Sequence, residues 1–521
     1  MPRYRVRIAG KHYDAMADLV RKHRLNIAGH TGKRAGRSRY VVDAFADSDQ
    51  IERLKSEGYS VDVLEDVHEA GKKRQSEIRS LTTREPIRNV AAANHYLNVP
   101  DIENSLAVAA TGSNAGFTRL IKLPNKTWEG RECHAIKIGQ GSVTSRPGIY
   151  FLGGIHAREW GSPDILIHFV EQLCEAYRTQ SGITLGGMDF TAVQIQKIVN
   201  EKDVYVFPQA NPDGRHHSMT QAPNWRKNRR PAPAGSSNPD CVGVDLNRNY
   251  DFLWNYTVHF DPNAPVANST DPCDHDVYIG PAPSSEPETK NVVWMFDNFP
   301  NIRYFIDIHS YSEDILYNWG DDQDQSQKPG MSFLNPAFDG KRGVAKDTRY
   351  QEYIASADKT AVVKLAKQMR TAILAVRGRK YAVTQSMSLY PTAGSSDDYA
   401  YSRHLADPSK PKIFSYTIEM GKRGQRNSIS SAVFGDETHH PGNHRGLASI
   451  LFADLKRLWC FLLTKLRLML RHEEIYRKHA DGTHGTARRI RRINVGRENE
   501  VRTHRYVAAL LLRAVAKSWL S

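Results

Sequence analysis

The sequence predicts an α/β fold, a mixed and mostly parallel twisted sheet flanked by helices, preceded by a small ferredoxin-like βαββαβ domain. Two patterns predict it: strands and helices alternate from about residue 97 to 466, and six short elements precede them within residues 1–70. The 521-residue chain is 40% hydrophobic and 25% charged, which excludes a disordered chain and a coiled-coil rod.

Short-range periodicity predicts each element of the first domain. Residues 4–8 alternate like a strand, and residues 13–23 have the spacing of an amphipathic helix. The remaining elements are strands at 26–29 and 39–45, a helix from about residue 48, and a strand at 59–64. Residues 71–96 are polar and rich in Lys and Arg, so we predict an exposed linker that trypsin-like proteases can cut.

The second domain is predicted over residues 97–466. Gly148–Gly154 is an apolar strand ending in glycines, and Ser162 is the expected N-cap of the helix that follows. Further strands are expected at 204–207 and 303–308, and a leucine-striped helix at 447–462.

The net charge of +15 is concentrated in a basic C-terminal tail, residues 467–521, which we expect to be loosely ordered. The rest of the chain does not have the charge of a nucleic-acid binder, although the tail leaves such a secondary role open. No stretch approaches the roughly 18 apolar residues of a membrane span. The N-terminus has no signal-peptide pattern.

Two histidines predicted at strand ends are candidate metal ligands. His156 and Glu159 come directly after the strand 148–154, and His309 follows the strand 303–308. The carboxyl ends of strands in an α/β sheet are where ligands bind, and a catalytic zinc needs three such ligands. His168 and Glu171 repeat the spacing but fall inside an amphipathic helix. From these residues alone, metal binding and structural histidines remain equal alternatives.

The residues together resemble the zinc metallocarboxypeptidases of the carboxypeptidase A and B type, over about nine-tenths of the chain. The matching segments are dense and in order, and residues 1–70 resemble the family's activation propeptide. They are Gly154–Trp160, Asn211–Gly214, Trp225–Asn228, Gly243–Tyr250, Ile308–Tyr311, Tyr390–Asp398 and Tyr416–Glu419.

The resemblance implies a zymogen that hydrolyses the C-terminal bond of peptides and proteins after an activating protease cuts it, acting as a monomer. It implies one Zn²⁺ on His156, Glu159 and His309, with Asp245 orienting His156. The implied catalytic residues are Glu419, the general base, and Arg226, which stabilises the oxyanion. The implied substrate-binding residues are Asn247, Arg248 and Tyr390 for the terminal carboxylate, and Arg158 and Tyr311 further upstream.

Three further expectations follow from the resemblance. Asp397 matches the floor of the pocket for the final side chain, and an acid there implies a preference for C-terminal Arg or Lys. Cys241 and Cys273 match a family disulfide, which implies secretion, while the missing signal peptide leaves a cytoplasmic location open. Insertions at 254–272 and 321–357 depart from the family and could reshape the mouth of the site. A zinc amidohydrolase acting on acylated amino acids, and an inactive binding protein, remain alternatives.

Overall fold

The computed structural model describes residues 3–10, 40–78, 95–141, 146–185 and 188–421, together with residues 15, 18, 19, 22, 23, 25–27, 33 and 34. The predicted helix at 447–462, the tail 467–521 and linker residues 79–94 lie outside the described residues. Within the described part of the chain, no helix is both long and apolar enough to cross a membrane.

The N-terminal domain has the strand order of the predicted βαββαβ arrangement. Its central strand β1 (Arg3–Gly10) pairs antiparallel with β4 (Tyr40–Asp47) and β5 (Ser60–Asp66). The short strands β2 (Asn26–Ile27) and β3 (Lys33–Arg34) both pair with β4, and α2 (Ser48–Ser56) joins β4 to β5. Of the predicted first helix, residues 15, 18, 19, 22 and 23 are described; the first three are helical, and the last two form a turn.

The structure differs from the predicted linker at its beginning. Residues Val67–Gln75 form a helix, α3, and Arg74 in it is buried with its guanidinium 3.9 Å from the ring centre of Trp160. Arg74 Nη2 also donates to the carbonyl of Pro223 at 2.8 Å. The polar composition of this segment suggested exposure, and Lys72 and Lys73 are exposed, but Arg74 is used in docking, because a guanidinium can stack on an indole face.

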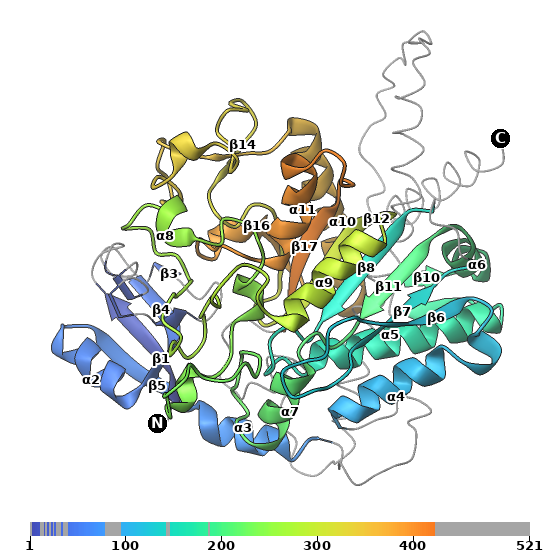
Figure 1. Ribbon diagram of the computed structural model, residues 1–521, viewed down its shortest axis with the longest axis horizontal. Coiled ribbons are helices and arrows are strands. Elements are labelled where there is room, and N and C mark those ends of the chain that lie inside the picture. The colour runs from blue at the N-terminus through green and yellow to red at the C-terminus, as the bar shows by residue number, and fades with distance from the viewer. Residues whose placement is uncertain are drawn as a thin grey trace, which may run out of the picture. The chain divides into compact units, whose positions relative to one another are not determined.

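A mixed eight-stranded sheet forms the centre of the second domain, in the order β16-β13-β17-β12-β8-β11-β7-β6 (Figure 1). Its four central strands, β17 (Phe414–Met420), β12 (Ile302–Ser310), β8 (Gly148–Gly153) and β11 (Asp203–Phe207), are parallel. The outer strands are β6 (Thr118–Lys122), β7 (His134–Ile138), β13 (Asp314–Tyr317) and β16 (Ala382–Gln385). This confirms the predicted α/β class.

Helices cover both faces of the sheet because its central strand is apolar on both sides. Ile149 and Phe151 of β8 pack into the core that includes α5 (Gly161–Arg178), whereas Tyr150 and Leu152 pack into the core that includes α9 (Pro287–Asn298). The other helices are α4 (Val99–Ala109), α6 (Ala192–Glu201), α7 (Pro212–Thr220), α8 (Tyr256–His259), α10 (Ser356–Arg377) and α11 (Ser396–Ala406). The short strands β9 (Ile183–Leu185) and β10 (Met188–Phe190) form a hairpin, and β14 (Asp324–Gln325) pairs with β15 (Glu352–Tyr353).

The two predicted insertions pack against each other. His259 Nδ1 lies 2.8 Å from Asp339 Oδ1, and Arg349 Nη2 pairs with Asp261 Oδ2 at 2.8 Å. Residues of the first insertion also line the largest cavity of the site, described below. The insertions therefore form one structural unit, of which the first insertion lines the cavity.

Candidate active site

The carboxyl ends of three neighbouring parallel strands bring the candidate residues together. His156 follows β8, His309 is the penultimate residue of β12, and Glu419 is the penultimate residue of β17. In the sheet register Ile308 lies opposite Gly153, and His309 lies opposite Glu419. Strand pairing thus places these three side chains at one edge of the sheet.

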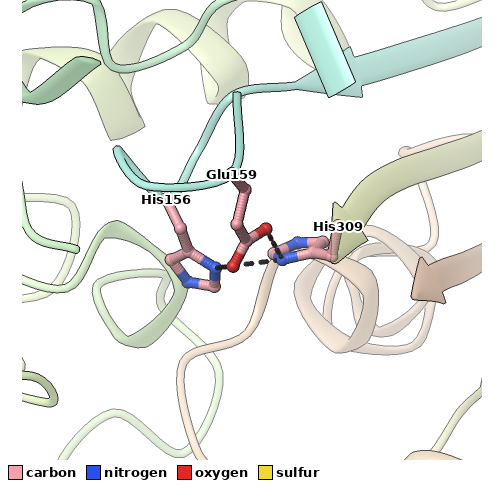
Figure 2. A group of neighbouring side chains, drawn as sticks. All are labelled: His156, Glu159 and His309. Carbon is pink, nitrogen blue, oxygen red and sulfur yellow. Dashed lines mark hydrogen bonds and ion pairs between the residues drawn. The ribbon is translucent and has the colours of Figure 1, made fainter. Parts of the chain in front are cut away.

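His156, Glu159 and His309 form a buried cluster with the donor set of a zinc site (Figure 2). His156 Nδ1 lies 2.7 Å from Glu159 Oε1, and His309 Nδ1 lies 3.2 Å from Glu159 Oε2. The two Nδ1 atoms are 3.0 Å apart. Two imidazole nitrogens and a carboxylate that converge in this way fit a divalent cation, and zinc prefers this combination of ligands.

The outer nitrogens of both histidines face carboxylates, as expected of metal ligands. His156 Nε2 lies 3.3 Å from Asp245 Oδ1, and His309 Nε2 lies 3.0 Å from Asp307 Oδ2. Asp245 is the residue that the resemblance expects to orient His156, and this role stays a prediction. The sequence reasoning missed Asp307, although residues two apart in a strand share a face, and this spacing could have indicated it.

The loop that carries His156 and Glu159 is held from two sides. Gly154 has φ +65°, and a Cβ there would come within 3.1 Å of the Gln209 backbone, so this tight turn requires glycine. We had expected Ser162 to be the N-cap of α5, but the helix begins at Gly161. The Ser162 hydroxyl instead accepts a hydrogen bond from the Gly154 amide at 2.9 Å. On the other side, the Ala157 amide donates to the Arg226 carbonyl at 3.0 Å.

Arg226 lies beside the cluster and is bound by the carboxylate of Asp245, which also faces His156. Its Nε and Nη2 atoms donate to Asp245 Oδ2 at 3.0 and 2.8 Å, and Nη1 is 3.4 Å from His156 Nδ1. Burial alone would raise the pKa of Asp245, but Arg226 and His156 hold it well below its usual value. Asp245 therefore remains ionised and fixes both the arginine and the imidazole.

Glu419 is half-buried and lines a cavity of about 100 Å³ together with Glu159, Arg226, Tyr311 and Tyr390. Burial raises the pKa of Glu419, and the nearby carboxylates of Glu159 and Asp314 raise it further. The positive charges of His309 and Arg226 lower it, but the net effect on the pKa is upward. A carboxyl group whose pKa is raised into the neutral range can both accept and return a proton.

Arg248 and Tyr390 line a second, larger cavity of about 590 Å³, which Arg226 also lines. Arg248 is buried, and its Nε and Nη1 atoms donate to the carbonyls of Ala267 and Asn247, both at 2.7 Å. Asn247 Oδ1 accepts the Ser396 amide at 2.8 Å. Since Arg226 and Tyr390 line both cavities, the two cavities adjoin in one cleft, which Arg248 lines on one side and Glu159 of the histidine cluster lines on the other.

Arg158 and Tyr311 line the smaller cavity on the side of Glu159. The peptide bond between Ser310 and Tyr311 is cis. Arg158 Nη1 donates to Asp276 Oδ1 at 3.1 Å. The sequence reasoning did not single out Asp276, which lies 118 residues from Arg158 in the chain and three residues after Cys273.

Asp397 is buried in the first turn of α11, and its Oδ2 accepts a hydrogen bond from Ser386 at 3.2 Å. A Cβ at Gly320 would meet Asp398 Oδ2 and Thr392 Oγ1 at 2.7 Å, so Gly320 faces the same loop. Neither Asp397 nor Gly320 lines the two cavities above, and no ion pair of Asp397 occurs within the described residues.

Cys241 and Cys273 form the predicted disulfide.

A model of the zinc carboxypeptidase family matches residues 105–434. The chain belongs to this family. It is 30% identical to carboxypeptidase B of Rattus norvegicus over 301 residues, which are 57% of each chain, and 30% identical to carboxypeptidase B of Astacus astacus over 300 residues, 57% of this chain and 78% of that one. The match thus spans little more than half of the rat relative.

Two solved structures share the fold of this carboxypeptidase-family chain. Carboxypeptidase A of Helicoverpa armigera has a TM-score of 0.62 at 18% identity, covering 89% of this chain and 98% of that one. Thrombin activatable fibrinolysis inhibitor has a TM-score of 0.60 at 18% identity, covering 90% and 100%.

Proposed function

We propose that this protein is a zinc-dependent carboxypeptidase that removes the final residue of peptides and proteins. The observation that supports this most directly is the common cleft of Arg248 and the histidine cluster. A guanidinium fits a free carboxylate, and such a group beside hydrolytic residues selects the end of a chain over its interior.

The residues have roles that agree with this reaction. One zinc ion per chain on His156, Glu159 and His309 would lower the pKa of a water molecule and polarise the scissile carbonyl. Glu419 takes a proton from the attacking water and returns it to the leaving amine. Arg226 donates to the oxyanion that develops on the carbonyl. Asn247, Arg248 and Tyr390 hold the substrate's terminal carboxylate.

We expect the chain, cut within residues 79–94 by limited trypsin, to release the last residue from N-blocked dipeptides. Incubation with a zinc chelator, followed by its removal, should abolish this activity, and one equivalent of Zn²⁺ should restore it. Hydrolysis is measured by release of the free amino acid, and blocked amino-acid amides test for amidohydrolase activity. A chelated enzyme of undiminished activity would contradict the metal mechanism.

We further propose that the uncut chain is a zymogen and that its N-terminal domain covers the cleft. Ile27, Phe45 and Val67 of that domain line the cavity that contains Glu419. The Asn224 side chain donates to the Val67 carbonyl at 2.6 Å, which fixes α3 at the same edge of the cleft. A polypeptide substrate cannot reach the histidine cluster while these contacts persist.

Activity should therefore rise at least about tenfold when the linker is cut and the N-terminal domain is removed. A closed state that is favoured over the open state by only about 1.4 kcal/mol already leaves about one-tenth of the chains open. The measurement compares initial rates of the full-length and cut chains at equal zinc content. A chain nicked elsewhere, such as in an exposed loop of the second domain, is the control. Equal rates before and after cutting would count against latency.

The family resemblance, which matches Asp397 to the floor of the pocket for the final side chain, supports a preference for C-terminal Arg or Lys, while Asp397 lines neither of the two cavities in the uncut chain. Its buried carboxylate would gain a charged partner from such a side chain, whereas an apolar residue would leave it unpaired. We expect peptides ending in Arg to have a kcat/KM about 10- to 100-fold above that of peptides ending in Leu, as hydrogen bonds to charged groups contribute about 1.5–3 kcal/mol.

Substitution Asp397→Ile should reverse this order. Asp407→Asn, which changes an exposed acid at the end of the same helix, should leave it unchanged. A wild-type enzyme that prefers Leu would refute the basic preference but not the carboxypeptidase reaction.

A further inference from the structure

Asp276 binds a guanidinium of the N-terminal domain at the edge of the cleft. Arg3 Nη2 lies 2.8 Å from Asp276 Oδ2, and Arg3 Nη1 lies 2.8 Å from His275 Nδ1. The other carboxylate oxygen of Asp276 accepts from Arg158. Asp276 is only 3% exposed, and although burial opposes ionisation, Arg3 and Arg158 hold its pKa well below the usual range.

The position of this carboxylate is fixed by the second domain itself. Asp274 Oδ1 accepts the amides of Asp276 and Val277, both at 2.9 Å, directly after the disulfide at Cys273. Lys227, next to Arg226, donates to the Asp274 carbonyl at 2.6 Å. The carboxylate should therefore stay in place when the N-terminal domain leaves, while its Oδ2 atom loses Arg3.

The place of Arg3 lies on the path that a peptide substrate would take. Arg3 lines both cavities together with Arg226 and Tyr390. In the proposed reaction Arg248 binds the terminal carboxylate in the larger cavity. The rest of the peptide then extends past Arg226 into the smaller cavity, toward Arg158. Arg158 immediately precedes the ligand Glu159 and holds Asp276, which places the carboxylate near the residues just before the scissile bond.

We propose that Asp276 forms a subsite for a basic side chain of the substrate, at one of the two residues that precede the scissile bond. In the uncut chain Arg3 occupies this subsite as a stand-in for the substrate. The inference rests on the proposed carboxypeptidase function and adds a second position at which the enzyme recognises charge, separate from Asp397.

The test compares tripeptides that share one C-terminal residue and carry either arginine or its uncharged isostere citrulline at the penultimate or preceding position. With the cut chain freed of its N-terminal domain, arginine at one position should raise kcat/KM about fivefold to tenfold, mainly through KM. Asp276→Asn should bring this ratio to about one and leave the preference for the C-terminal residue unchanged. The matched control is Asp271→Asn, an exposed acid lining the same 590 Å³ cavity, which should keep the ratio.

A binding measurement separates failure of the subsite from failure of the reaction. Fluorescently labelled forms of the same peptides are titrated into the cut Glu419→Gln variant, with and without Asp276→Asn. Equal affinity for the arginine and citrulline peptides at both positions overturns the subsite, whatever the activity assay gives. If affinity discriminates but wild-type enzyme cleaves no peptide, the proposed reaction fails and the subsite stands.

Discussion

Substitution His309→Ala should remove most of the bound zinc and nearly all peptidase activity. Loss of an outer partner alone typically weakens metal binding by about 10- to 100-fold, and His309 supplies one of three direct ligands, so we expect more than a hundredfold loss of affinity. Metal content after dialysis and kcat/KM on a blocked dipeptide check this prediction. A variant that retains stoichiometric zinc would refute the ligand assignment.

The chain contains a matched control for this substitution. His168 has the same spacing to Glu171 as His156 has to Glu159, but it lies buried within α5. His168→Gln should therefore keep its zinc and, after correction for folded protein, its activity, whatever it costs in thermal stability. Loss of zinc from both variants would indicate general unfolding instead of ligand removal.

Substitution Glu419→Gln should lower kcat by about 10²- to 10⁴-fold, because an amide cannot take a proton from water or return one to the leaving amine. Zinc content should remain one per chain, since Glu419 lies opposite His309 but is not in the cluster of ligands. Pre-steady-state and steady-state rates on one peptide give kcat directly.

The control is Glu175→Gln, an exposed glutamate of α5, which should have the wild-type rate. If Glu419→Gln loses zinc together with activity, the residue is structural to the metal site, and the assignment as general base fails.

The elements that short-range patterns specify could be predicted from the sequence. β8 is apolar throughout and ends in glycine, so both its class and its burial follow from the residues. Helix α3 could not be predicted in this way, because its sequence is polar on most sides. It is stabilised by long-range contacts, in which Arg74 stacks on Trp160 and Gly71 lies close to Pro223.

The same distinction holds at the site. His156, Glu159 and His309 follow predicted strands, and their convergence follows from parallel pairing. The ion pair between Arg158 and Asp276 depends on a disulfide-closed loop whose path no local pattern gives. Ser162 has the residue type of an N-cap, yet the turn at Gly154 uses its hydroxyl. Local propensity therefore identified the elements, and tertiary contacts decided how individual polar groups are used.

The docking of α3 has a consequence for the kinetics of activation. A cut within residues 79–94 leaves α3 on the released fragment, with Arg74 still able to bind Pro223 and Gln75 able to donate to the Ser218 carbonyl. In the intact chain these contacts act at an effective concentration on the order of millimolar, which the covalent connection maintains. Cutting replaces that value with the bulk concentration of fragment, so cleavage and activation become separate events. The second event is a reversible dissociation that proceeds further as the protein is diluted.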